Sequence, residues 1–315
     1  MAIRYSVVIP VYKNEENIPR LVEVLERLAS KVGPEMEVVF VVDGSPDQSY
    51  ALLRSAIATV SFPAQLLAHS RNFGSFPAIR TGLSAARGEY FGVMAADLQE
   101  PPELMEQFFE TLSADTCDIA IGTRAHRNDP LVSRAASTLF WSAYRSAIVH
   151  DMPKGGVDVF GCNRKFRDEL LKLEESRSSL IALIFWLGFR RTLISYERQT
   201  RLEGKSAWTL KKKIDYFMDS VFAFTDYPIR LLMRLGAVGV LLSGVTGTAV
   251  IVARLSGAIN VPGYAATIIT VLFFGTLNIF GLGLVGTYAW RAYENSKHRP
   301  LAILARHYQN DKGES

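Results

Sequence analysis

Oxygen-bearing side chains follow a short apolar run near the middle of the chain. The run Tyr90–Met94 is typical of a buried strand, and Asp97, Gln99 and Glu100 come directly after it. A proline pair then leads into a helix that begins near Glu103. Ligands bind beyond the carboxyl ends of strands in open parallel sheets, and these oxygens suit Mg²⁺ or Mn²⁺ carrying a phosphate. A solvated turn with a helix-capping aspartate is the alternative.

Polar residues also follow two earlier strand-like runs. They are Pro10, Tyr12, Asn14 and Glu15 at the end of the first run, and Asp43, Gly44, Ser45 and Asp47 after the second. Adjacent parallel strands bring such loops to one edge, where acidic side chains can bind a ribose, a base edge or a metal. Taken singly, the Asp-Gly-Ser-Pro sequence is an ordinary turn signal. Taken together, the three clusters predict a nucleotide site.

The first two hundred residues alternate between strand-like and helix-like patterns. Strands are predicted over Tyr5–Val11, Glu37–Val42, Gln65–Ala68, Tyr90–Met94 and Asp118–Gly122. Helices are predicted over Gln48–Thr59, Phe76–Arg87 and Glu103–Leu112, and a further helix after the first strand has the apolar positions Ile18, Leu21, Val22, Leu25 and Leu28. This alternation predicts an α/β fold: a mostly parallel, Rossmann-like sheet with helices on both faces, ending near Glu203.

The second half of the chain is unusually apolar. Of the 315 residues 49% are hydrophobic, and the mean hydropathy of +0.12 is high for a wholly soluble enzyme. No charged residue lies between Arg234 and Arg254, or between Arg254 and Arg291. Each stretch supplies the ~20 apolar residues that cross a bilayer, so we expect two transmembrane helices. A pair of buried core helices is the alternative, although such helices seldom run so far without a charged face.

Basic residues flank the two spans and predict their orientation. They are Lys211, Lys212, Lys213, Arg230 and Arg234 before the first span, and Arg291, Lys297, Arg299 and Arg306 after the second. Lys and Arg mark the cytoplasmic side, so we expect a multi-pass protein of the bacterial inner (plasma) membrane with both termini in the cytoplasm. The N-terminus does not have the pattern of a signal peptide, and the two cysteines fit a reducing compartment.

The net charge of +4 is attributed to contact with lipid head groups and phosphates. Because the sequence shows no basic run with interleaved aromatic residues, we do not expect a nucleic-acid partner. Glycines within both spans permit close helix packing, which is consistent with a homo-oligomer.

An amphipathic pattern precedes the first span, within residues 210–227. Apolar residues recur there at helical spacing, and Pro228 is expected to end the helix. We expect this helix to lie at the membrane surface, with packing on the catalytic domain or on a neighbouring subunit as the alternative. The expected domains are residues 1–209 (catalytic), 210–232 (juxtamembrane), 233–292 (transmembrane hairpin) and 293–315 (cytoplasmic tail).

Ordered motifs along nearly the whole chain resemble one enzyme family. The segments VVIPVYKNEEN, VDGSPD, HSRNFG and AADLQEPPE resemble the family 2 glycosyltransferases of the GT-A fold. The segments GTRAHR, GGVDVF, RLEGKSAW and LGLVGTYAWRAYENSKHRP resemble, more narrowly, bacterial polyprenyl-phosphate glycosyltransferases such as the bactoprenol glucosyltransferases, and dolichol-phosphate mannose synthases. The resemblance implies inverting transfer of a sugar from a nucleoside diphosphate sugar, with UDP favoured, to polyprenyl (undecaprenyl) phosphate.

The resemblance also implies roles for single residues. The donor nucleotide would be contacted by Pro10, Tyr12, Glu15 and Asp43, with Arg71 and Asn72 beside it, and Asp97 with Gln99 would hold Mg²⁺ or Mn²⁺ on the diphosphate. The cations expected near the acceptor phosphate are Arg124, Arg127, Arg134 and Lys205, assisted by Ser137 or Thr138. Asp158 would orient the sugar or the acceptor. The alternatives are solvated surface charges for the cations and a structural aspartate for Asp158.

Two departures from the family pattern concern carboxylates. The family usually has two aspartates where this chain has Val42-Asp43, and Asp-x-Asp where it has Ala95-Ala96-Asp97. The second departure predicts weaker or water-completed metal binding. Two other functions are considered: a processive polysaccharide synthase, whose Gln-x-x-Arg-Trp motif is missing here, and a non-catalytic membrane scaffold or regulatory subunit, which only Val42 and Ala95 support.

Overall fold

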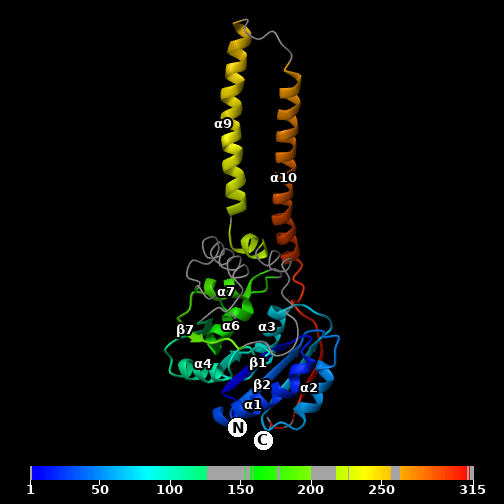
Figure 1. Cartoon of the computed structure of the whole chain (residues 1–315), viewed down its shortest axis with the longest axis vertical. Helices are drawn as coiled ribbons and strands as arrows, with labels where there is room; N and C mark the ends of the chain where they lie inside the picture. The colour runs from blue at the N-terminus through cyan, green and yellow to red at the C-terminus, as the bar shows by residue number, and fades with distance from the viewer. Residues whose placement is uncertain are drawn as a thin grey trace. The chain divides into compact units, whose positions relative to one another are not determined.

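The computed structural model describes residues 2–125, 153, 157, 159–175, 178–199, 218–225, 227–256, 263–310 and 312. The chain divides into two compact units (Figure 1). The first, which we call the α/β unit, comprises Met1–Tyr216 and Arg299–Ser315, and the second, the helical unit, comprises Phe217–His298. The α/β unit is therefore assembled from both ends of the sequence.

One eight-stranded sheet forms the centre of the α/β unit, with the strand order β7-β5-β6-β4-β1-β2-β3-β8. The strands are β1 (Tyr5–Val11), β2 (Met36–Val42), β3 (Ala64–His69), β4 (Tyr90–Val93), β5 (Ile119–Arg124), β6 (Phe160–Asn163), β7 (Arg191–Tyr196) and β8 (Leu304–Gln309). Only β6 and β8 run antiparallel to their neighbours in this sheet. The other six therefore end at one common edge.

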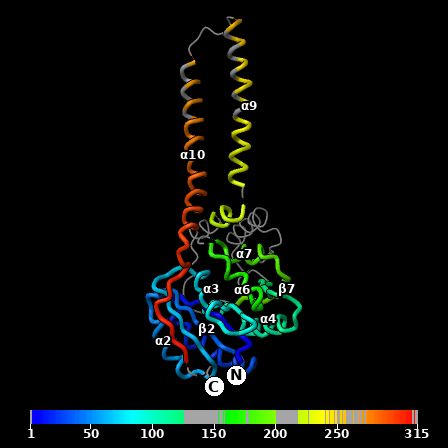
Figure 2. Tube along the Cα trace, turned by 180° about the vertical axis from the view of Figure 1, so that it is seen from behind, coloured from blue at the N-terminus to red at the C-terminus, as the bar shows by residue number. Residues whose placement is uncertain are grey.

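Helices cover both faces of this sheet (Figure 1, Figure 2). They are α1 (Ile18–Val32), α2 (Ser49–Ile57), α3 (Ser75–Ala85), α4 (Glu103–Ser113), α6 (Arg164–Lys172) and α7 (Leu180–Trp186), with the 3₁₀ turn η1 (Glu15–Asn17). Helix α1 contacts α2 and α4, whereas α3 contacts β1, β2 and α6. Every residue of β2 is buried, as a strand covered on both faces requires. The predicted fold class, an α/β protein with a mostly parallel sheet, is confirmed.

The strand at the β3 edge is the main difference from the sequence interpretation, which treated residues 293–315 as a tail. Strand β8 has the sequence LARHYQ, and its first four residues are exposed. It pairs with β3 across more than two hundred residues of sequence. A short polar edge strand has neither the apolar alternation nor the local turn by which strands are recognised in a sequence.

The helical unit contains α9 (Tyr227–Leu255), α10 (Tyr264–Ser296) and a short helix over 218–224. Helices α9 and α10 each hold a segment long and apolar enough to cross a membrane, Tyr227–Thr246 and Phe273–Ser296. Apolar side chains on them are exposed: Leu241 by 68% and Ile279 by 72%. Exposure of this extent does not fit the alternative of buried core helices.

The short helix over 218–224 is packed against the last turns of α10. Arg291 forms an ion pair with Asp219 at 2.6 Å, and the Tyr288 hydroxyl donates a hydrogen bond to the Thr225 carbonyl at 3.2 Å. The Phe222 ring lies edge-on to Tyr288. The helix ends before Pro228, which instead lies in the first turn of α9, where proline is tolerated. Residues 210–217 of the expected amphipathic segment lie outside the described residues.

Candidate active site

The predicted residues of the nucleotide site, the metal site and the acceptor site that the structure describes lie at strand ends along one edge of the sheet. The parallel strands that end there are, in order, β3, β2, β1, β4, β5 and β7. The residues concerned are Arg71 and Asn72 after β3, Asp43 after β2, Pro10, Tyr12 and Glu15 at the end of β1, Asp97 and Gln99 after β4, and Arg124 as the last residue of β5. Arg127, Arg134, Ser137, Asp158 and Lys205 lie outside the described residues.

The loops after β1 and β2 are joined by a set of hydrogen bonds centred on Asp47. Its carboxylate accepts hydrogen bonds from the Ser45 and Ser49 hydroxyls and from the Glu15 backbone N–H. Glu15 in turn accepts from the backbone N–H of Gln48 at 2.7 Å. Burial raises the pKa of Asp47, but the hydrogen bonds from Ser45 and Ser49 outweigh this effect, so its pKa lies below the ordinary value. Hydrogen bonds therefore hold the loops after β1 and β2 in one fixed arrangement.

Asp43 binds the last residue of β3 and the turn that follows it, and we call these residues together the loop of residues 69–74. Its carboxylate accepts hydrogen bonds from the backbone N–H groups of Phe73 and Gly74, at 2.8 and 2.7 Å, and contacts His69 Nδ1 at 2.8 Å. His69 Nε2 lies 2.9 Å from the Thr81 hydroxyl. A carboxylate offers about four acceptor positions, and three here are already used by the protein. Asp43 therefore holds the loop, and little of it is left for a nucleoside.

Gly44 permits the close approach of the loops after β2 and β3. Its φ of +57° is one that side chains with a Cβ rarely adopt, and a Cβ placed there would lie 2.2 Å from the Arg71 carbonyl carbon. Arg71 and Asn72, carried by this loop, are exposed and accessible to a ligand. The sequence alone gives no role to His69, although its position at the end of a strand, in the HSRNFG motif, is a usable signal.

The loop after β4 takes an unusual backbone conformation between the two predicted metal ligands. Leu98 has a φ of +52°, which costs about 1–3 kcal/mol for a residue with a Cβ and is found preferentially at ligand sites. The Asp97 carboxylate accepts a hydrogen bond from the Gln99 backbone N–H at 3.4 Å. The Gln99 side-chain oxygen accepts one from Arg198, and its backbone carbonyl accepts one from Gln199 at 2.9 Å. Residues 198–199 therefore fasten this loop to the end of β7.

The donor set at this loop fits a hard divalent cation only in part. Asp97 supplies a carboxylate, and Mg²⁺ is usually held by one or two carboxylates together with substrate phosphates and water. The Gln99 oxygen is already bonded to the Arg198 guanidinium, so a metal there would have to share it. Within the described residues there is no group of three His, Cys, Asp or Glu side chains able to hold a metal. Of the two predicted metal ligands, Asp97 would therefore supply a carboxylate and Gln99 an oxygen shared with Arg198.

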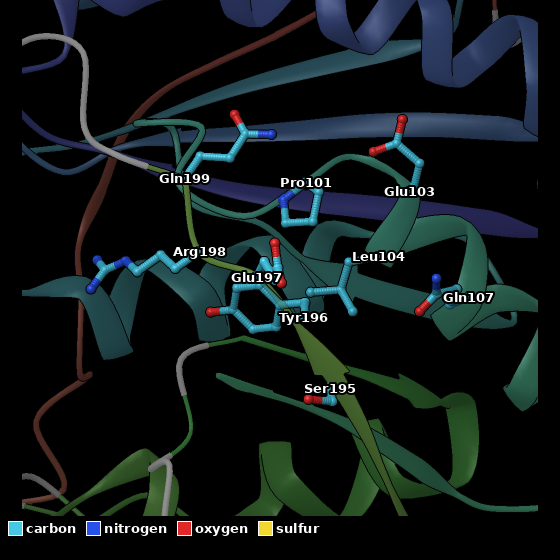
Figure 3. A pocket seen from close by; sticks show the side chains of 9 residues that line it. All are labelled: Pro101, Glu103, Leu104, Gln107, Ser195, Tyr196, Glu197, Arg198 and Gln199. Atoms are coloured by element: carbon cyan, nitrogen blue, oxygen red, sulfur yellow. The ribbon is translucent and has the colours of Figure 1, made fainter. Parts of the chain in front are cut away.

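A cavity of about 370 Å³ lies between the start of α4 and the end of β7 (Figure 3). Its lining residues are Pro101, Glu103, Leu104 and Gln107 from the α4 side, and Ser195, Tyr196, Glu197, Arg198 and Gln199 from the β7 side. Arg198 lines this cavity and bonds to Gln99, so the cavity adjoins the loop that carries Asp97.

Comparison with known proteins shows the family to which this chain belongs. Residues 6–173 match the model of Glycosyl transferase family 2, and this chain therefore belongs to that family. It is 30% identical over 311 residues to YkcC, an uncharacterized glycosyltransferase of Bacillus subtilis, with 97% of this chain and 94% of that one covered. The predicted glycosyltransferase family is confirmed.

Two further proteins are similar to this chain. It is 27% identical over 304 residues to the bactoprenol glucosyl transferase of Shigella phage SfV, with 96% of this chain and 98% of that one covered. Among solved structures, mannosyl-3-phosphoglycerate synthase from Rubrobacter xylanophilus is similar with a TM-score of 0.48 and 14% identity, and 75% of each chain is covered.

Proposed function

We propose that this protein transfers a sugar from a nucleoside diphosphate sugar to a polyprenyl phosphate, with inversion, at the cytoplasmic face of a bacterial plasma membrane. One observation carries the proposal, a combination of two features in a single chain. The loops after β1 and β2, joined by hydrogen bonds, lie at the same sheet edge as the loop that carries Asp97. The same chain has two helices long enough to cross a bilayer. The similarity to a bactoprenol glucosyl transferase over nearly the whole of both chains supports it. A UDP-sugar is the favoured donor.

The donor nucleotide would bind against the loops after β1, β2 and β3. Pro10 and Tyr12 are half-buried at the end of β1, while Arg71 and Asn72 are exposed in the loop after β3. Asp43 would act mainly by holding the loop that carries Arg71, because its carboxylate is used by protein donors. The diphosphate would then lie near Asp97, and a bound Mg²⁺ or Mn²⁺ would neutralise part of its charge.

The reaction itself is a single displacement. An oxygen of the acceptor phosphate attacks the anomeric carbon, and the bond from that carbon to the diphosphate oxygen breaks with its electron pair leaving on the diphosphate. The acceptor phosphate is already ionised near neutral pH, so it needs orientation and cations rather than a strong base. Arg124, which ends β5 at the same edge, is proposed to supply one cation. Arg127, Arg134, Ser137 and Lys205 are proposed to complete the acceptor site, with Asp158 orienting the reactants.

The helical unit would keep the enzyme at its lipid substrate. Helices α9 and α10 are proposed to span the membrane, with both termini in the cytoplasm, and the packed helix over 218–224 to lie at head-group level. Trp290 and Tyr293 are about half exposed near the end of α10, and aromatic residues of this kind favour the membrane interface. Assembly as a homo-oligomer is part of the proposal.

A donor screen tests this function. Purified protein in detergent is incubated with undecaprenyl phosphate, Mg²⁺ or Mn²⁺, and a series of UDP- and GDP-sugars, and glycolipid is measured. We expect product from one donor, abolished by EDTA and reduced about 10²–10³-fold in Asp97→Asn, the cost of removing one electrostatic group that acts in the transition state. The matched control is Glu110→Ala, which removes an exposed carboxylate of α4 and should leave the rate unchanged.

Other results of the screen would contradict the proposal in specific ways. A polymer in place of a single-sugar lipid would identify a processive synthase. Failure to bind any nucleotide, together with no product from any donor, would favour the non-catalytic scaffold, with Val42 and Ala95 as the decisive changes.

A further inference from the structure

The chain that leaves α10 returns to the α/β unit and adds β8 to the outer edge of β3. The pairing is antiparallel and runs from Gln65 opposite Gln309 to His69 opposite Leu304, with a bulge between Ala68 and His69. Figure 2 shows this red segment at the edge of the sheet. Strand β3 leads directly into the loop of residues 69–74, which Asp43 holds. Strand β8 therefore lies beside the origin of a donor-site loop.

Asn310 anchors one end of β8 inside the α/β unit. The residue is 5% exposed. Its side-chain oxygen accepts a hydrogen bond from the Ala64 N–H at 2.9 Å, and its amide nitrogen donates to the carbonyls of Ile57 and Phe62 at 3.2 and 3.1 Å. The Asn310 backbone N–H also donates to the Ala64 carbonyl. One buried side chain thus ties β8 to the start of β3 and to the connection after α2.

The middle of β8 is held by side chains from α2 and β3. The Arg54 guanidinium lies 3.1 Å from the centre of the Tyr308 ring, and Arg306 lies over Tyr50 at 5.3 Å. His307 Nε2 lies 3.1 Å from the Gln65 side-chain oxygen. These contacts fix β8 laterally as well as at its end.

The other end of β8 reaches the loop of residues 69–74 itself. The Ser70 backbone N–H donates to the Ile303 carbonyl at 3.0 Å. From the inner side, the same loop is held by Asp43 and packs closely on Gly44. The loop that presents the exposed Arg71 and Asn72 is therefore fixed between two supports, one from β2 and one from the strand that follows α10.

We infer that β8 is a positioning element of the donor site, which it holds by bracing the loop of residues 69–74. This inference rests on the proposed function. Without β8, β3 would become an edge strand with unpaired backbone groups, and Ser70 would lose its outer partner. The loop would then sample more conformations, and part of the binding free energy of the donor would be spent on ordering it. The acceptor side, at β5 and β7, would change little.

The experiment measures donor and acceptor separately in the full-length protein with Asn310→Ala. We expect the dissociation constant of UDP, measured by calorimetry, and the donor KM to rise about five- to tenfold, as the loss of one or two net hydrogen bonds predicts. The acceptor KM and kcat should stay within about twofold of the wild type, because the altered loop is at the donor end. Deletion of residues 313–315, which leaves Asn310 and Lys312 in place, is the control and should not change UDP binding.

Each outcome decides the inference. Unchanged UDP affinity in folded Asn310→Ala overturns it, and so does an equal rise of donor and acceptor KM, which would indicate a general loss of structure. Should Asn310→Ala fail to fold, Asn310→Asp keeps the acceptor for Ala64 and is judged by the same two readouts. A wild-type protein that binds UDP but forms no glycolipid would refute the proposed function. The change in the dissociation constant of UDP in Asn310→Ala would still test the role of β8. A wild-type protein that binds no nucleoside diphosphate refutes both.

Discussion

At the scale of single residues, the carboxylates of this site differ in their tasks. Asp43 and Asp47 are surrounded by backbone N–H groups and hydroxyls, and they fix the loops after β1, β2 and β3. Asp97 makes a longer hydrogen bond, 3.4 Å, to its own loop. A carboxylate whose oxygens already accept several hydrogen bonds from the protein mainly fixes the positions of the loops around it. Asp43 and Asp47 therefore hold the loops around them, and Asp97 remains the predicted carboxylate ligand of the metal.

Gly44→Ala should impair the site more than a glycine substitution elsewhere. The new Cβ would lie 2.2 Å from the Arg71 carbonyl carbon, at a φ of +57°, so the loop of residues 69–74 must shift. We expect the donor KM to rise and the unfolding free energy to fall by about 1–3 kcal/mol, the cost of a strained backbone position. Gly33→Ala is the matched control, because Gly33 also has a positive φ but no atom lies within 4 Å of its Cβ position. Equal donor KM values for the two variants would contradict this account.

At the scale of elements, the end of the sheet opposite the site is held by ion pairs. Asp118, just before β5, accepts hydrogen bonds from Arg190, just before β7, and from Asn163 at the end of β6. These bonds join β5, β6 and β7, the strands beside which the acceptor site is proposed. The helical unit shows the same principle, since the helix over 218–224 is fixed to α10 by Asp219 and Arg291.

The Asp118 contacts predict a pH dependence of stability. The hydrogen bond from Arg190 is the largest cause that lowers the pKa of Asp118 below its ordinary 3.8. A carboxyl group whose pKa is lower in the folded state than in the unfolded state stabilises the folded state fully above pH 3.8. This contribution is lost as the pH falls through the pKa of the folded state. In Asp118→Asn the melting temperature at pH 7 should be lower than in the wild type. The further fall of the melting temperature from pH 5 to pH 3 should be smaller in the variant than in the wild type. Identical pH profiles in scanning fluorimetry would disprove this role.

At the scale of the whole molecule, the α/β unit is interrupted by the helical unit. Residues Phe217–His298 separate Met1–Tyr216 from Arg299–Ser315, and the second segment contributes β8 and Asn310. Truncation after residue 216 therefore removes a strand as well as the hairpin. The division between the α/β unit and the helical unit therefore does not coincide with a single cut in the sequence.

A chain that joins residues 1–216 to 299–315 through a flexible linker tests this organisation. With about 20 Gly/Ser residues, whose ends lie about 25 Å apart on average, it should bind UDP with an affinity near that of the full chain. It should also fail to bind vesicles and lose most activity on undecaprenyl phosphate, because the hairpin is absent. Truncation at residue 216 should bind UDP more weakly than the linked chain. Equal UDP binding by the two would show that β8 is dispensable.

The sequence alone determined the local elements and the identity of the family. Strand β1 was predicted with its observed bounds, and β2, α3 and α4 to within one or two residues, because each carries a strong apolar period with proline or glycine near its ends. The motifs that follow these strands predicted which loops meet at one edge. The two long apolar helices were equally evident, since hydropathy is additive along a segment and needs no knowledge of packing.

Only the tertiary structure decided what each loop residue does. It showed that Asp43 is bonded to the loop of residues 69–74, that Arg198 contacts Gln99, and that residues 304–309 form an edge strand. Each of these contacts joins segments far apart in the chain: Gln99 and Arg198 are 99 residues apart, and Ala64 and Asn310 are 246 apart. A local pattern records the period and the turn chemistry of a segment. The partners of a carboxylate or of an edge strand are determined by the packing of the whole chain.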